Sequence, residues 1–141
     1  MKRSGPITRT KPIAKKRGTS TAAKKRKAIQ LWGQYVHARD VICQRCGKGD
    51  GKLDAHHVMI RHFAATVADE TNGVLLCFKC HGLMHSDPLD ALIFYTERYG
   101  ADGYDDLRHK AYSGQGMTLR AEHWDEAITR LQALIDGTEN E

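Results

Sequence analysis

Residues 77–85 read CFKCHGLMH, and this short stretch holds two kinds of metal ligand. It begins with the Cys-x-x-Cys pair Cys77 and Cys80 and continues with His81 and His85, which are four residues apart. Another Cys-x-x-Cys pair lies earlier in the chain. Because a tetrahedral zinc ion takes four ligands, the chain offers more ligands than one ion requires. We therefore expect the sulfur and nitrogen ligands to form separate sites.

The earlier pair is Cys43 and Cys46, and with Cys77 and Cys80 it predicts a structural zinc site. Each pair bends the backbone so that two thiolates face one point, and four sulfurs leave no room for a substrate. Two facing pairs are typical of metal ligands rather than disulfides in a reducing compartment. A rubredoxin-like iron centre and a pair of redox dithiols are the alternatives.

The histidines predict a second, open metal site. On a helix, His81 and His85 lie on the same face. The alternation over residues 53–60 predicts a strand, on which His56 and His57 point to opposite sides. One of these two can bind the ion with His81 and His85, while the other acts as a base, and the ion keeps open positions for water and a phosphate oxygen. The remaining histidines are interpreted as structural, namely His37, His62, His109 and His123.

The sequence over residues 40–88 resembles the HNH or ββα-metal nucleases in a four-cysteine form. The residues that carry the resemblance are DAHHV at 54–58, Asn72 in TNGVLLC, and CFKCHGLMH at 77–85. The resemblance implies an α+β fold, in which a zinc-stapled HNH core at 41–88 has flanking helices. It also implies a metal-dependent endonuclease that hydrolyses DNA phosphodiesters to 5′-phosphate and 3′-hydroxyl ends.

The same resemblance assigns roles to single residues. His57 takes the general-base position, and Asn72 takes the position that holds the loop and orients the basic imidazole. His56, His81 and His85 take metal positions. Many relatives have Asp where His56 stands, so the cofactor beside the structural Zn²⁺ is expected to be Mg²⁺, Mn²⁺, Ni²⁺ or Zn²⁺, with a softer ion favoured by an all-histidine site.

Charge is distributed unevenly along the chain. Residues 1–39 contain 12 Lys or Arg and no Asp or Glu, residues 40–85 contain 5 of each sign, and residues 86–141 contain 5 basic and 12 acidic side chains. DNA is therefore expected to meet the N-terminal part and to be repelled by the C-terminal part. The candidate DNA-binding residues are Lys15, Lys16, Arg17, Lys24, Lys25, Arg26, Lys27 and Arg61.

The flanking segments divide the rest of the chain. Residues 1–20 predict a disordered basic arm, and residues 21–40 predict a basic amphipathic helix capped by Ser20 or Thr21. Residues 89–141 predict a helical C-terminal region, with helices expected at 87–100, 104–111 and 118–136 and with Gly100 and Gly137 as helix ends. That region weakly resembles phage recombination nucleases of the NinG-like kind.

No apolar run long enough for a membrane span and no signal peptide is present, so we expect a cytoplasmic protein encoded by a bacterium or phage. We expect DNA as the partner, with weak sequence preference, and neither a membrane nor a small organic cofactor. The alternatives are a structure-specific recombination nuclease and a noncatalytic, zinc-stabilised DNA-binding module. A third alternative is an iron-containing electron carrier, whose function would not require a basic arm.

Overall fold

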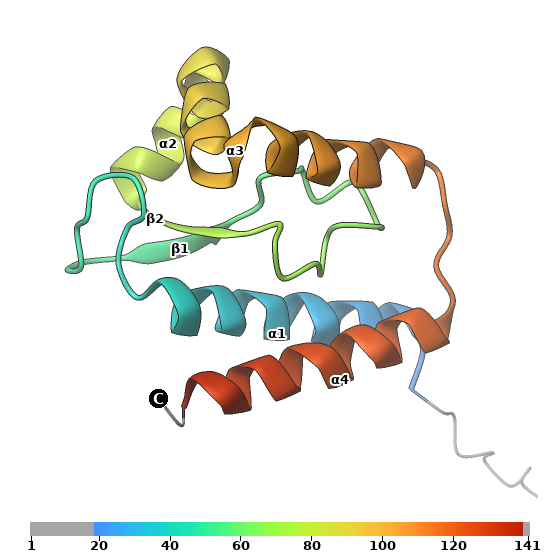
Figure 1. Cartoon of the computed structure of the whole chain (residues 1–141). Coiled ribbons are helices and arrows are strands. Elements are labelled where there is room, and N and C mark those ends of the chain that lie inside the picture. The colour runs from blue at the N-terminus through green and yellow to red at the C-terminus, as the bar shows by residue number, and fades with distance from the viewer. Residues whose placement is uncertain (1–18, 140–141) are drawn as a thin grey trace, which may run out of the picture.

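The computed structural model describes residues 19–139, which fold as four helices around a two-stranded sheet (Figure 1). The elements in chain order are α1 (Thr21–Asp40), β1 (Leu53–His56), β2 (Val74–Cys77), α2 (Phe78–Ser86), α3 (Pro88–Ser113) and α4 (Ala121–Thr138). The expected α+β class is confirmed, and β1, β2 and α2 form a small ββα core. Apart from its last two residues, the arm expected at 1–20 lies outside the described part of the chain.

The antiparallel sheet separates two hydrophobic cores. Val74 and Leu76 of β2 face a core shared with α2 and α3, whereas Leu75 between them faces a core shared with α1 and α4. Because both faces of the sheet are covered, β2 is apolar throughout. The expected strand at 53–60 is too long, since the pairing with β2 stops at His56, opposite Val74. Alternation alone does not make a strand where no partner strand is present.

Helices α1 and α4 lie side by side and run in the same direction (Figure 1). Leu31 and Trp32 of α1 and Trp124 and Leu131 of α4 are buried in one core. Their apolar stripes bring the acidic C-terminal segment against the basic one, so the two charges that are separate in the sequence lie close together in the fold. Lys24 Nζ lies 2.5 Å from an Asp125 carboxylate oxygen across this contact.

Of the two glycines predicted as helix ends, Gly100 interrupts the helix as predicted, whereas Gly137 does not. Gly100 has a φ of 73°, in the left-handed region that favours glycine, and α3 continues in a new direction directly after it. The helices expected at 87–100 and 104–111 are thus two arms of α3. Gly137 lies inside α4, which runs to Thr138, so its role as a helix end is wrong.

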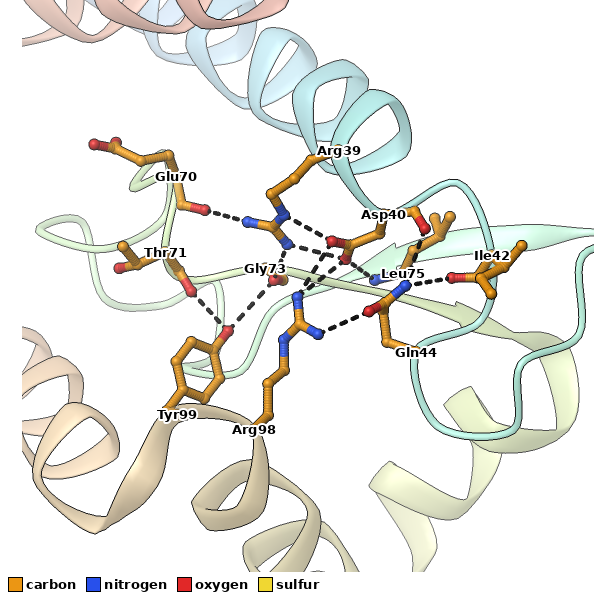
Figure 2. Close-up of polar contacts among 10 residues, drawn as sticks. All are labelled: Arg39, Asp40, Ile42, Gln44, Glu70, Thr71, Gly73, Leu75, Arg98 and Tyr99. Carbon is orange, nitrogen blue, oxygen red and sulfur yellow. Dashed lines mark hydrogen bonds and ion pairs between the residues drawn. The ribbon is translucent and has the colours of Figure 1, made fainter. Parts of the chain in front are cut away.

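A buried carboxylate fastens the end of α1 to the sheet and to α3 (Figure 2). Asp40 accepts hydrogen bonds from the Leu75 backbone N–H (2.9 Å), from Arg39 Nε (2.7 Å) and from Arg98 Nη2 (3.2 Å). Burial alone would raise the pKa of Asp40, but these hydrogen bonds and the two guanidinium charges outweigh burial and lower it. Asp40 is therefore ionised near neutral pH, and it joins three elements of the fold.

The two arginines extend this network to the loop that precedes β2. Arg39 donates to the carbonyls of Glu70 (2.8 Å) and Gly73 (2.7 Å), and Tyr99 donates to the carbonyl of Thr71 (2.7 Å), as Figure 2 shows. Arg98 Nη1 also donates to the Gln44 side chain (3.0 Å). The start of β2 is thus held from both sides, by α1 and by α3.

Replacing Asp40→Asn is expected to lower the free energy of unfolding at pH 7 by about 1–3 kcal/mol, because two guanidinium groups lose their buried anionic partner. Since the folded pKa of Asp40 is lowered, its contribution is present above the unfolded value of about 3.9 and is lost as the pH falls through the folded value. The difference between parent and variant should therefore shrink in acid. Urea unfolding of both proteins at pH values from 7 to 3 measures this difference in unfolding free energy.

The exposed pair Asp105 and Arg108 supplies the control. Asp105→Asn should change the unfolding free energy by less than about 0.5 kcal/mol at any of these pH values. An Asp40→Asn protein as stable as the parent at pH 7 would show that the network contributes nothing.

Candidate functional site

The four cysteines converge beside the start of α2. Cys43 and Cys46 lie in the turn after α1, Cys77 ends β2, and Cys80 lies in the first turn of α2. Their sulfur atoms all lie within 4.8 Å of one another, and the Cys46 and Cys77 sulfurs are 3.7 Å apart. Four thiolates bound at about 2.3 Å to one tetrahedral ion stand about 3.8 Å apart. The cysteines are free of disulfides, and this cysteine cluster fits a single metal ion.

The protonation of these thiols depends on their different surroundings. Burial alone would raise the pKa of Cys43, but backbone N–H groups of Cys77, Cys46 and Arg45 outweigh it and lower the pKa to about 6. Burial raises the pKa of Cys80 to about 12, although Arg45 donates to its sulfur and opposes the rise. Because metal ligation requires thiolates, binding of an ion at this cluster releases protons.

Three histidines from β1 and α2 form a second group. His56 is the last residue of β1, and His81 and His85 lie one turn apart on α2. Their candidate ligand atoms lie within 4.8 Å of one another, and their ring centroids are 4.9–5.2 Å apart. This histidine cluster, His56, His81 and His85, is close enough for all three rings to bind one ion. The structure thus places the candidate sulfur and nitrogen ligands in two separate groups, and their binding of metal ions stays a prediction.

The chemistry of the histidine cluster also suits a metal. Burial, followed by the neighbouring His81, His85 and His57, lowers the pKa of His56 to about 3. Its ring is therefore neutral at pH 7, as a ligand must be. Asp54 of β1 lies with one carboxylate oxygen 3.7 Å from His81 Nδ1. The Tyr95 hydroxyl lies 2.6 Å from His56 Nε2.

His57 leaves the strand and faces different neighbours from His56. Its ring stacks on Trp32 of α1, with centroids 3.6 Å apart and planes 12° apart. His57 Nε2 lies 2.9 Å from the Val67 carbonyl oxygen. A carbonyl only accepts, so Nε2 carries the proton and Nδ1 keeps a lone pair. Burial lowers the pKa of His57 to about 4; the Val67 hydrogen bond opposes this shift and Arg61 adds to it.

Asn72 acts on the loop between the strands rather than on the imidazole itself. Its side chain is fully buried, and its Oδ1 accepts from the Met59 N–H at 2.6 Å. Its Nδ2 donates to the carbonyls of Met59 (3.0 Å) and Thr66 (2.8 Å). Since Val67 follows Thr66, Asn72 fixes the backbone segment that supplies the carbonyl to His57.

One cleft of about 540 Å³ joins these groups. Its lining combines both histidine groups with an apolar wall from α1, and comprises Ile29, Trp32, Ala55, His56, His57, Ile60, Arg61, His81 and His85. An imidazole with a free lone pair and a group of three rings that could bind a metal ion therefore share one solvent-accessible space. This is the arrangement of a candidate active site.

The predicted DNA-binding residues have different surroundings. Lys24 is paired with Asp125, and Lys25 lies over the Trp124 ring at 5.8 Å. Arg26 and Lys27 are exposed, and Arg61 is exposed at the cleft. Lys15, Lys16 and Arg17 lie outside the described residues. The basic run on α1 is thus divided between contacts to α4 and solvent.

Sequence reasoning missed three contributors to the site. Trp32 is buried in the core, and it is also the ring on which His57 stacks. Val67 acts through its backbone carbonyl, for which a sequence carries no signal. Tyr95 is separated from His56 by the whole of β2 and α2, so only the folded arrangement reveals their contact.

Comparison with known proteins gives one positive finding. The family model described as HNH endonuclease matches residues 43–87, the segment that contains both ligand sets. No curated protein and no solved structure matches the chain. Within residues 19–139 no helix has the length and apolar character needed to cross a membrane. Residues 43–87 therefore match an HNH endonuclease domain, and the four grouped cysteines are consistent with a zinc-binding subtype of it.

Proposed function

We propose that the chain is a metal-dependent endonuclease that hydrolyses phosphodiester bonds in DNA. The observation that supports this most strongly is the shared cleft, in which His57 keeps a free Nδ1 lone pair beside the histidine cluster. The HNH match implies a nucleic acid substrate, and the exposed basic side chains of α1 suit a phosphate backbone.

His57 is the proposed general base. Its Nδ1 accepts a proton from a water molecule that attacks the phosphorus atom. The Val67 carbonyl holds the Nε2 proton, which fixes the tautomer throughout, and it stabilises the imidazolium that forms. The Trp32 ring beneath the imidazole restricts its rotation and favours a cation on its face. Asn72 is a positioning residue for this loop.

His56, His81 and His85 would hold the catalytic ion. A bound divalent ion would neutralise charge on the phosphate oxygens and on the leaving 3′ oxygen, and this ion is Mg²⁺, Mn²⁺, Ni²⁺ or Zn²⁺. The cleavage products are then a 5′-phosphate and a 3′-hydroxyl. Arg61 at the cleft carries a positive charge for the scissile phosphate or its neighbours.

Changing His57→Ala is expected to lower the cleavage rate by about 10²–10⁴-fold, because the attacking water loses its base. The measurement is conversion of supercoiled plasmid to nicked and linear forms with each of the four divalent ions. His62→Ala is the matched control, since His62 is an exposed histidine of the same loop, and it should cut like the parent.

Two results would contradict this proposal. If the His57→Ala protein cuts as fast as the parent, His57 is not the base. If the parent binds DNA in a salt-sensitive way and no ion stimulates cleavage, the chain is a noncatalytic DNA-binding module.

The cysteine cluster is proposed to hold a structural Zn²⁺ that remains when the catalytic ion is removed. Cys46→Ser should remove this zinc and abolish cooperative folding, because a structural zinc contributes on the order of 10 kcal/mol. His85→Ala should keep the zinc and the fold while losing the second ion. Elemental analysis together with thermal unfolding measures both variants. A Cys46→Ser protein with full zinc content and an unchanged melting temperature would refute the assignment, as would iron in the parent.

The surroundings of the basic run predict unequal contributions to DNA binding. Arg26→Ala and Lys27→Ala should each weaken binding and reduce the slope of log affinity against log salt by about 0.9, as for the loss of one phosphate contact. Lys24→Ala should have a smaller effect on that slope, because Asp125 already neutralises Lys24. Fluorescence anisotropy with a labelled duplex at several salt concentrations tests this order. Equal slopes for all three variants would show that the exposure of a basic side chain on α1 does not determine whether it contacts DNA.

A further inference from the structure

Tyr95 of α3 lies outside the matched HNH segment and yet contacts a predicted metal ligand. Its hydroxyl oxygen is 2.6 Å from His56 Nε2, and both side chains are buried, with residue exposures of 7% for Tyr95 and 5% for His56. The proposed reaction gives Tyr95 no part. A buried contact of this kind needs an explanation, because it uses one of the two nitrogens of a ligand ring.

The contact determines which nitrogen of His56 can bind an ion. A neutral imidazole has one nitrogen with a proton and one with a lone pair. When His56 Nε2–H donates to the Tyr95 oxygen, Nδ1 holds the lone pair. Hydrogen bonds from the second nitrogen of a ligating histidine commonly fix its tautomer and ring orientation, and their loss costs about 10–100-fold in metal affinity.

The position of the Tyr95 hydroxyl is set by the scaffold. Its ring stacks against His56, with centroids 6.1 Å apart, and against Tyr104, with centroids 5.9 Å apart. Within the next helical turn, Arg98 binds Asp40 and Tyr99 donates to the Thr71 carbonyl. The helix that carries Tyr95 is therefore tied to α1 and to the loop before β2.

We propose that Tyr95 is a positioning residue for the metal centre, in which its hydroxyl oxygen accepts from His56 Nε2–H and so presents His56 Nδ1 to the ion. This inference rests on the proposed function, in which the histidine cluster binds one divalent ion. It assigns to α3 a direct part in the metal centre, beyond packing on the ββα core.

The test is Tyr95→Phe in the full chain, which removes only the hydroxyl. Protein with zinc in the cysteine cluster is titrated with Co²⁺ in the absence of DNA by isothermal calorimetry, and thiolate-to-cobalt absorption reports any exchange at the cysteines. The variant should bind Co²⁺ about 10–100-fold more weakly than the parent, and it should still unfold cooperatively in the Co²⁺-free form. Tyr104→Phe is the matched control, because Tyr104 belongs to the same aromatic stack and, in residues 19–139, forms no hydrogen bond with the histidine cluster.

A second measurement shows which nitrogen of His56 carries the proton. Long-range ¹H–¹⁵N spectra of the imidazoles should show His56 protonated at Nε2 in the parent without Co²⁺, and a mixture of tautomers in Tyr95→Phe. Unchanged Co²⁺ affinity in the variant would overturn the inference. Tighter binding would overturn it as well, because the hydroxyl would then block Nε2 from the ion.

These outcomes are distinct from failure of the proposed function. If the parent binds no Co²⁺ at the histidines, the metal centre itself is refuted together with this role for Tyr95. If the parent binds Co²⁺ and Tyr95→Phe binds it equally well, the positioning role alone is refuted and the nuclease proposal stands.

Discussion

The junction between β2 and α2 is the constraint on which the rest of the site depends. Cys77 ends the strand and serves as the N-cap of the helix, and its side chain makes no capping hydrogen bond. A helix as short as α2 is marginal alone in water. The convergence of four sulfurs at its first turn therefore fixes where the helix starts. Because His81 and His85 follow within the same helix, the position of the sulfur cluster also sets the position of these two candidate ligands.

The two adjacent histidines obtain their separate surroundings from helices outside the matched segment. His57 stacks on Trp32 of α1, and His56 meets the hydroxyl of Tyr95 on α3. The buried carboxylate of Asp40 connects these two helices through Arg98 and through the backbone of β2. The flanking helices thus hold the ββα core and also contribute to the environment of its histidines.

The sequence predicted which cysteines and which histidines lie together, because their type and spacing indicate the chemistry that they can support. It predicted α1 and its cap well, since Ser20 accepts from Ala23 N–H as a capping residue does. It failed where a backbone or a distant element decides the outcome. The strand stops at His56 because β2 offers no partner beyond that residue, and α4 continues past Gly137 to Thr138. The contacts of His57 with Val67 and of His56 with Tyr95 depend on tertiary structure alone, so no local pattern predicts them.

The hydrogen bond from His57 to the Val67 carbonyl tolerates substitution of the Val67 side chain. Its acceptor is a main-chain oxygen, which every amino acid possesses, so exchange of one apolar side chain for another at position 67 leaves the imidazole tautomer unchanged. The vulnerable property is instead the length of the connection between the strands. Gain or loss of a single residue there would move the oxygen relative to the ring, even with every ligand intact.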